Sequence, residues 1–148
     1  MSTTINGVVR YAQNPYIATD AGSDNVMGEQ ATVMTSHPTL SGATVLGEVM
    51  APRGGILKFV YINGSVTSDA TKTYTLVITN VSKSKTMTAA GQVWDADPVL
   101  TAGTRSAATL STTAADVAVD EGDLIQVSVA GGTGAGSAAV ELVFEFDA

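Results

Sequence analysis

The sequence contains no cysteine, a single histidine and few aromatic residues. Without cysteine the chain can form no disulfide bond, thiolate metal site or thiol nucleophile, so its stability has to come from packing or assembly. Aromatic residues make up only 5% of the 148 positions, although 45% are hydrophobic. The core must therefore use small and β-branched side chains, including 18 valines, which favour strands over helices. The composition predicts one all-β domain.

Positive charge is absent from residues 106–148. All seven Lys and Arg residues precede position 106, whereas seven of the fourteen Asp and Glu residues lie between Asp116 and Asp147. The net charge of −7 therefore belongs to the C-terminal third. Because no extended basic face can form, we expect neither nucleic acid nor an anionic membrane surface as a direct partner.

Targeting and membrane-spanning patterns are also missing from the sequence. Residues 1–6 lack the basic and apolar regions of a signal peptide, and no run approaches the roughly 18 apolar residues of a membrane span. We therefore expect synthesis in a cytoplasm.

Residues 1–41 show little apolar periodicity. They carry turn-forming pairs such as Asn14-Pro15 and His37-Pro38, and we interpret the segment as an extended N-terminal arm. It nonetheless contains too many apolar residues for an ordinary disordered tail. We expect these residues to cover another surface, such as a neighbouring subunit.

Residues 42–148 are predicted to form the compact domain. Short runs of alternating apolar and polar residues are separated there by Gly, Asn, Asp and Ser, which is typical of a sandwich or barrel. In the run from Ala138 to Phe146, apolar residues alternate with acidic ones, which predicts a strand with one acidic outer face. The run from Ile56 to Ile62 is apolar on both faces apart from Lys58, so we expect a central strand or one under the arm. The eight expected strands are Ala43–Met50, Ile56–Asn63, Thr73–Asn80, Thr86–Ala89, Ala107–Thr112, Val117–Val119, Leu124–Val129 and Ala138–Phe146.

Three turn-forming segments separate these strands. They are Asn63-Gly64-Ser65, residues 82–85 and the glycine-rich residues 130–137. We expect each to close a hairpin, and the glycine-rich one to be a flexible loop that offers a contact tip.

No catalytic constellation can be assembled from the residues present. The lone His37 precedes a proline in the arm, and no Gly-x-Ser-x-Gly motif accompanies it. The glycine-rich segment lacks the Gly-Lys-Ser/Thr of a phosphate-binding loop and joins two predicted strands instead of opening a helix. We therefore expect neither an enzyme nor a cofactor.

Two pairs of carboxylates lie in predicted loops. Asp95/Asp97 and Asp120/Asp123 supply the oxygen ligands that calcium prefers, but Asp is also an ordinary turn former, so both roles stay open. Trp94 adjoins the first pair. It fits either a partly buried packing role or a surface role, stacking on a sugar or anchoring an interface.

Three further segments carry a resemblance to known proteins. Residues 49–57 (VMAPRGGIL), 74–78 (YTLVI) and 119–127 (VDEGDLIQV), followed by a closing strand over 140–146, resemble the jelly-roll modules of virion surface proteins. The chain is most similar to the head decoration, or cement, proteins of tailed bacteriophages, which are small, cysteine-free and carry an N-terminal arm. The pattern is also similar to the trimeric heads of tumour-necrosis-factor and complement C1q-like proteins, and the missing signal peptide favours the phage family.

The resemblance implies a jelly-roll β-sandwich of about eight antiparallel strands with an extended N-terminal arm. It also implies a mechanical function in the virion: copies, often homotrimers, sit on the capsid surface and tie neighbouring capsomers of the major capsid protein together. The expected capsid or subunit contacts are Tyr11, Tyr16 and Ile17 of the arm, together with Trp94. The alternative is a receptor- or carbohydrate-binding module of a tail or fibre that uses Trp94, Asp95/Asp97 and the glycine-rich loop.

Overall fold

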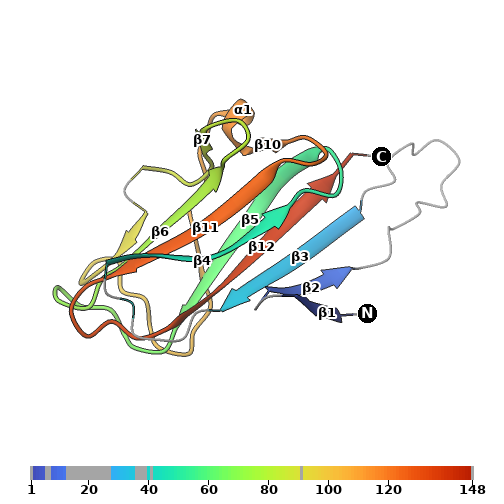
Figure 1. Ribbon diagram of the computed structural model, residues 1–148. Helices are drawn as coiled ribbons and strands as arrows, with labels where there is room; N and C mark the ends of the chain where they lie inside the picture. Colours follow the sequence, from blue (N-terminus) through green and yellow to red (C-terminus); the bar gives the residue numbers. More distant parts are fainter. Residues whose placement is uncertain are drawn as a thin grey trace, which may run out of the picture.

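Strands are the main regular structure of the part of the chain that the structure describes (Figure 1). A computed structural model describes residues 2–5, 8–12, 28–35, 40, 42–90 and 92–147. One short helix, α1 (Ala114–Val117), lies in this part of the chain. The strands are β1 (Ser2–Ile5), β2 (Val8–Ala12), β3 (Gly28–Thr35), β4 (Gly42–Met50), β5 (Gly55–Gly64), β6 (Tyr74–Asn80), β7 (Lys85–Thr86), β8 (Val93–Trp94), β9 (Ser106–Ala107), β10 (Ala118–Val119), β11 (Leu124–Gly131) and β12 (Ala138–Phe146).

Two antiparallel sheets form a sandwich with jelly-roll topology. The large sheet has the order β1-β2-β3-β12-β5-β10, with β9 also paired to β5. The small sheet has the order β4-β11-β6-β7, with β8 also paired to β6. From β3 to β6 successive strands alternate between the sheets, and β11 and β12 return into the middle of each sheet. The set β3-β12-β5-β10 facing β4-β11-β6-β7 is the double Greek key of a jelly roll, which confirms the predicted fold class.

The longer predicted strands of residues 42–148 are confirmed within one or two residues. β4, β5, β6, β11 and β12 occupy the predicted positions. The prediction for residues 107–112 was too long, because pairing stops at Ala107 and only an isolated bridge joins Leu110 to Thr88. The short strand β8 and helix α1 were not predicted.

The large sheet continues into the segment interpreted as an arm. β3 pairs with β12 over eight residues, β2 pairs with β3, and β1 pairs with β2. Three strands of the large sheet therefore lie within the described residues of this segment. The sequence did not reveal these strands. The position of β3 depends on its backbone pairing with β12, and apolar and polar residues alternate only weakly along β3 itself.

The core lies between the inner faces of the two sheets. In β12 the exposure alternates at every residue, with Val140, Leu142, Phe144 and Phe146 buried, as predicted. β5 is an internal strand, but its outer face is open: Phe59 is 47% exposed and Ile56 is 39% exposed. The prediction of a central strand is therefore confirmed, although among the residues described its outer face is left open.

One of the three predicted hairpins is present. Residues 81–84 turn the chain from β6 into β7, with Thr79 opposite Thr86. The other two segments join strands that belong to different sheets, as the jelly-roll order requires. The glycine-rich segment is also closely packed: Ala135 is fully buried, and a Cβ atom on Gly132 would clash with the backbone of Thr71. This packing explains its glycines better than the predicted flexible tip does.

Candidate functional site

Of the four predicted contact residues, the structure describes the backbone of Tyr11 and the side chain of Trp94. The backbone of Tyr11 lies in β2, opposite Ser2 and Ala31, whereas Tyr16 and Ile17 lie outside the described residues. The side chain of Trp94 is only 4% exposed and belongs to the main hydrophobic cluster. This tryptophan therefore has the packing role, and its ring offers almost no area to a partner.

Asp95 and Asp97 form a turn. The Asp95 side chain accepts a hydrogen bond from the backbone N–H of Asp97 at 2.8 Å, and the Asp95 carbonyl accepts one from the hydroxyl of Ser68. This pattern is the ordinary use of Asp in a turn. In the part of the chain that the structure describes, no group of three or more acidic or histidine side chains is placed to hold a metal ion.

Asp120 and Asp123 share one cation, the ammonium group of Lys83. The Lys83 Nζ atom lies 3.0 Å from Asp120 and 3.3 Å from Asp123. Asp123, which is 8% exposed, also accepts hydrogen bonds from the side-chain amide of Asn80 at 2.7 Å and from the backbone N–H of Asp120 at 2.9 Å. A lysine thus occupies the position that a bound cation would take, and the cluster ties the β6–β7 turn to the turn before β11.

The protonation equilibria of this cluster follow its contacts. Burial alone would raise the pKa of Asp123, but hydrogen bonds from Asp120, Asn80 and Lys83 outweigh it and hold that pKa below its usual value. The hydrogen bond to Asp120 raises the pKa of Lys83, with a further contribution from Asp123. Both groups therefore stay charged near neutral pH, as a structural ion pair does.

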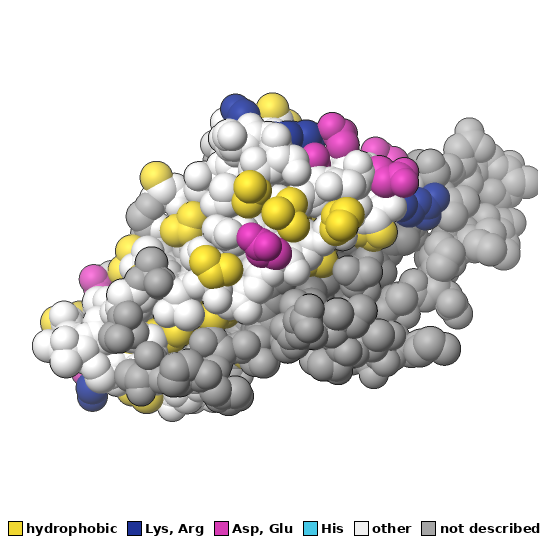
Figure 2. Space-filling model, viewed as in Figure 1, with side chains coloured by type: hydrophobic (Ala, Val, Ile, Leu, Met, Phe, Trp, Pro, Cys, Tyr) yellow, Lys and Arg dark blue, Asp and Glu magenta, His cyan; other side chains and the backbone are white. Residues whose placement is uncertain are grey.

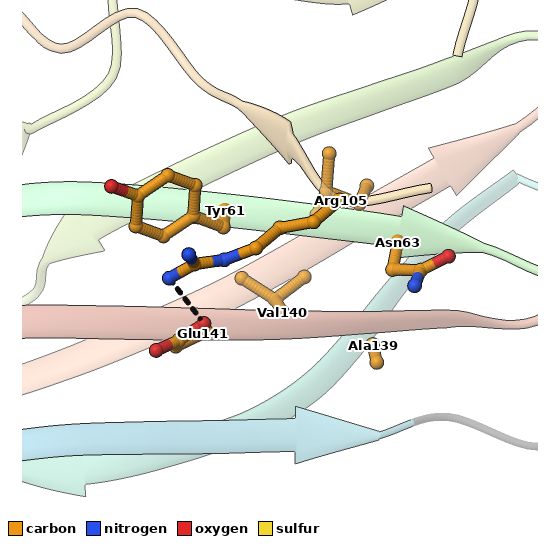
Figure 3. A pocket seen from close by; sticks show the side chains of 7 residues that line it. Tyr61, Asn63, Arg105, Ala139, Val140 and Glu141 are labelled. Carbon is orange, nitrogen blue, oxygen red and sulfur yellow. Dashed lines mark hydrogen bonds and ion pairs between the residues drawn. The ribbon is translucent and has the colours of Figure 1, made fainter. Parts of the chain in front are cut away.

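A hollow opens on the outer face of the large sheet, where β5 and β12 lie beside the segment before β9. Its volume is about 150 Å³. The Arg105 guanidinium crosses the hollow, with its central carbon 3.4 Å from the centre of the Tyr61 ring and a nitrogen 2.8 Å from Glu141 (Figure 3). The lining residues are Tyr61, Ile62, Asn63, Arg105, Ala139, Val140 and Glu141.

Next to this hollow the outer face of the large sheet is apolar. Phe59 stacks on Tyr61 with ring centroids 6.1 Å apart. Lys58, the extra residue of a bulge opposite Val143 and Phe144, pairs with Glu145. Both described cations of this face are therefore neutralised within the chain, and the arrangement suits contact with another protein better than it suits chemistry.

The outer face of the small sheet carries a second apolar surface. On it, hydrophobic side chains gather around one acidic side chain over β4, β11 and β6 (Figure 2). Glu48 lies opposite Gln126 in the strand register and accepts a hydrogen bond from its side-chain amide at 2.8 Å. We call this surface the small-sheet patch; its apolar members are Val45, Met50, Val77, Val81 and Leu124.

Comparison with known proteins identifies no relative. No protein-family model, curated protein or solved structure matches the chain. In the described residues no helix is long and apolar enough to cross a membrane.

Sequence reasoning missed the side chains that dominate the two outer faces. Arg105 and Glu141 are 36 residues apart in the chain, and Glu48 and Gln126 are 78 residues apart. Only the strand pairing brings these partners together. One signal in the sequence could have revealed these faces: an apolar residue at a strand position whose side chain points outward, as at Phe59 and Val77.

Proposed function

We propose that this protein is a structural virion protein that decorates and stabilises the outer surface of a bacteriophage capsid, where it ties neighbouring capsomers together. The observation that carries the proposal is that both sheets of the jelly roll expose large apolar side chains on their outer faces. Phe59 is 47% exposed on the large sheet, and Met50 is 60% exposed on the small sheet. Apolar surface of this kind marks contact with other proteins.

The fold and the side-chain chemistry support the same proposal. Jelly rolls recur in viral capsid proteins, where they serve as building blocks. The described acidic clusters are used in turns and ion pairs inside the chain. A decoration protein needs no reaction centre, since each bound copy stabilises the shell by mass action.

We further propose that the copies form homotrimers, in line with the family that the sequence resembles. In a closed ring of three, each copy uses two different patches, one for each neighbouring copy, and a further face is left for the shell. Light scattering on the purified protein tests this part. A mass three times 15.0 kDa is expected, and a monomer mass at every concentration would remove preformed trimers.

Quantitative mass spectrometry of gradient-purified virus particles tests the function itself. We expect the copy number to be a fixed and large fraction of that of the major capsid protein. Absence from the particles would contradict the proposal.

The alternative is a receptor- or carbohydrate-binding module of a tail or fibre, because lectin domains share the jelly roll. A few copies per particle would favour it. The buried ring of Trp94 weighs against the sugar-stacking site that this alternative requires.

A further inference from the structure

The small-sheet patch has a regular layout that follows from strand register. Its middle row is polar and runs from Glu48 through Gln126 to Thr79. One flanking row is Met50, Leu124 and Val81, where Met50 is opposite Leu124 and the N–H of Val81 donates to the carbonyl of Leu124. The other flanking row joins Val45 and Val77 through Ser128. One carboxylate thus lies between two apolar rows.

Glu48 has no cation among the described residues. None of the ion pairs in this part of the chain includes it, and its described hydrogen-bond donor is the neutral amide of Gln126. In contrast, Glu141 and Glu145 on the large sheet each pair with a cation of the same chain. A protein that covered the small-sheet patch without a cation would bury a lone charge, which costs several kcal/mol.

We propose that the small-sheet patch is the surface that docks on the shell protein, and that the shell protein brings a Lys or Arg side chain, surrounded by apolar residues, to Glu48. This inference rests on the proposed capsid function and assigns the contact surface for it. A two-fold dimer fits this surface poorly, since two such faces meeting would place two uncompensated Glu48 carboxylates in one apolar layer. A basic group in an apolar surround matches both the charge and the two flanking rows.

The test measures binding of the full-length protein to purified heads from a phage that lacks this gene, by co-sedimentation over a range of protein concentrations. Removing the negative charge with Glu48→Gln should weaken binding about tenfold and make it less sensitive to salt. Placing a carboxylate in the apolar row with Val45→Asp should weaken binding about a hundredfold.

Matched control variants change the same chemistry away from the small-sheet patch. Asp97→Asn removes one exposed charge, and Val99→Asp alters a valine that is 48% exposed, close to the 53% of Val45. Both controls should bind as the unchanged protein does. Thermal unfolding of all four variants identifies any that fail to fold. If Val45→Asp fails to fold, Val77→Asp takes its place in the binding test.

Each outcome separates this inference from the proposed function. If the unchanged protein binds and the patch variants bind equally well, the docking surface is wrong while the capsid function stands. If Val45→Asp loses binding while Glu48→Gln keeps both its binding and its salt dependence, the small-sheet patch docks on the shell but the proposed Lys or Arg partner of Glu48 is wrong. If light scattering shows that Val45→Asp dissociates an oligomer, the occupant is a second copy and the inference is wrong. No binding of the unchanged protein would contradict the proposed function, and with it the shell as occupant.

Discussion

Asp123 lies in the turn before β11 and Glu48 lies on β4, the strand beside β11, yet their surroundings differ sharply. Asp123 is 8% exposed and receives hydrogen bonds from Asn80 and the Asp120 backbone, besides its ion pair with Lys83. Glu48 is exposed and receives one from the neutral amide of Gln126. The contrast teaches that the acidic residues of this chain have separate roles, one inside the fold and one toward a partner.

The largest effect on stability is expected at Asp123. Asp123→Ala leaves the buried amide of Asn80 without its acceptor and removes one of the two carboxylates that Lys83 contacts, so the free energy of unfolding should fall by about 3 kcal/mol. Urea denaturation measures this change. The exposed Glu121→Ala should stay within about 0.5 kcal/mol of the unchanged protein. A loss below about 1 kcal/mol at Asp123 would remove the contrast with Glu48.

Acid should remove the contribution of the carboxyl groups that hold the fold. The Thr71 hydroxyl and backbone lower the pKa of Asp69 from its ordinary 3.8 to about 2, and the pKa of Asp123 is also lowered. A lowered pKa in the folded state stabilises the fold above the unfolded pKa, and this contribution is lost as pH falls through the folded value. The free energy of unfolding should therefore drop between about pH 4 and pH 2.

The double variant Asp69→Asn, Asp123→Asn serves as the comparison for this loss of stability at acid pH. Its stability should depend less on pH over the same range, because two linked carboxyl groups are gone. Chemical denaturation at a series of pH values measures the slope. If the free energy of unfolding depends on pH as steeply as in the unchanged protein, other carboxyl groups cause the loss of stability at acid pH.

A smaller effect is expected at Arg105, whose side chain is 54% exposed. Arg105→Met removes the contact with the Tyr61 ring and the ion pair to Glu141, so it should cost about 1 kcal/mol. Lys72→Met breaks an exposed ion pair to Asp69 and should cost less than about 0.5 kcal/mol. Equal losses of stability for the two variants in thermal denaturation would show that the contact of Arg105 with the Tyr61 ring adds nothing to stability.

The smallest effect on stability is expected at Glu48. Because Glu48→Gln removes only an exposed charge, the free energy of unfolding should change by less than about 0.5 kcal/mol. The same variant should nonetheless bind heads about tenfold more weakly, as argued above. A large loss of stability would make Glu48 a structural residue like Asp123 and would end the comparison.

The long strands of the sandwich were predictable from sequence because their burial has period two. β12 shows this most clearly, with five buried apolar side chains alternating with partly exposed ones. The jelly-roll order came from a resemblance and agrees with the observed pairing. The strands before residue 40 were missed, because their place in the large sheet depends on pairing with β12 and not on local pattern.

The candidate surfaces were much less predictable than the strands. Trp94 attracted attention as the single tryptophan, but its place in the core depends on β8 pairing with β6. The Asp120/Asp123 pair suggested a cation, and the structure supplies Lys83 from a turn some 40 residues earlier in the chain. Outer-face contacts such as Arg105 over Tyr61 join distant segments, so no local pattern announces them.

Cryo-electron microscopy of the intact virus head would test the central claim most directly. The account predicts density for this jelly roll on the outside of the shell, with the face formed by β4, β11 and β6 against the shell protein and a Lys or Arg of that protein within reach of Glu48. Heads without such density, or density with that face open to solvent, would contradict it.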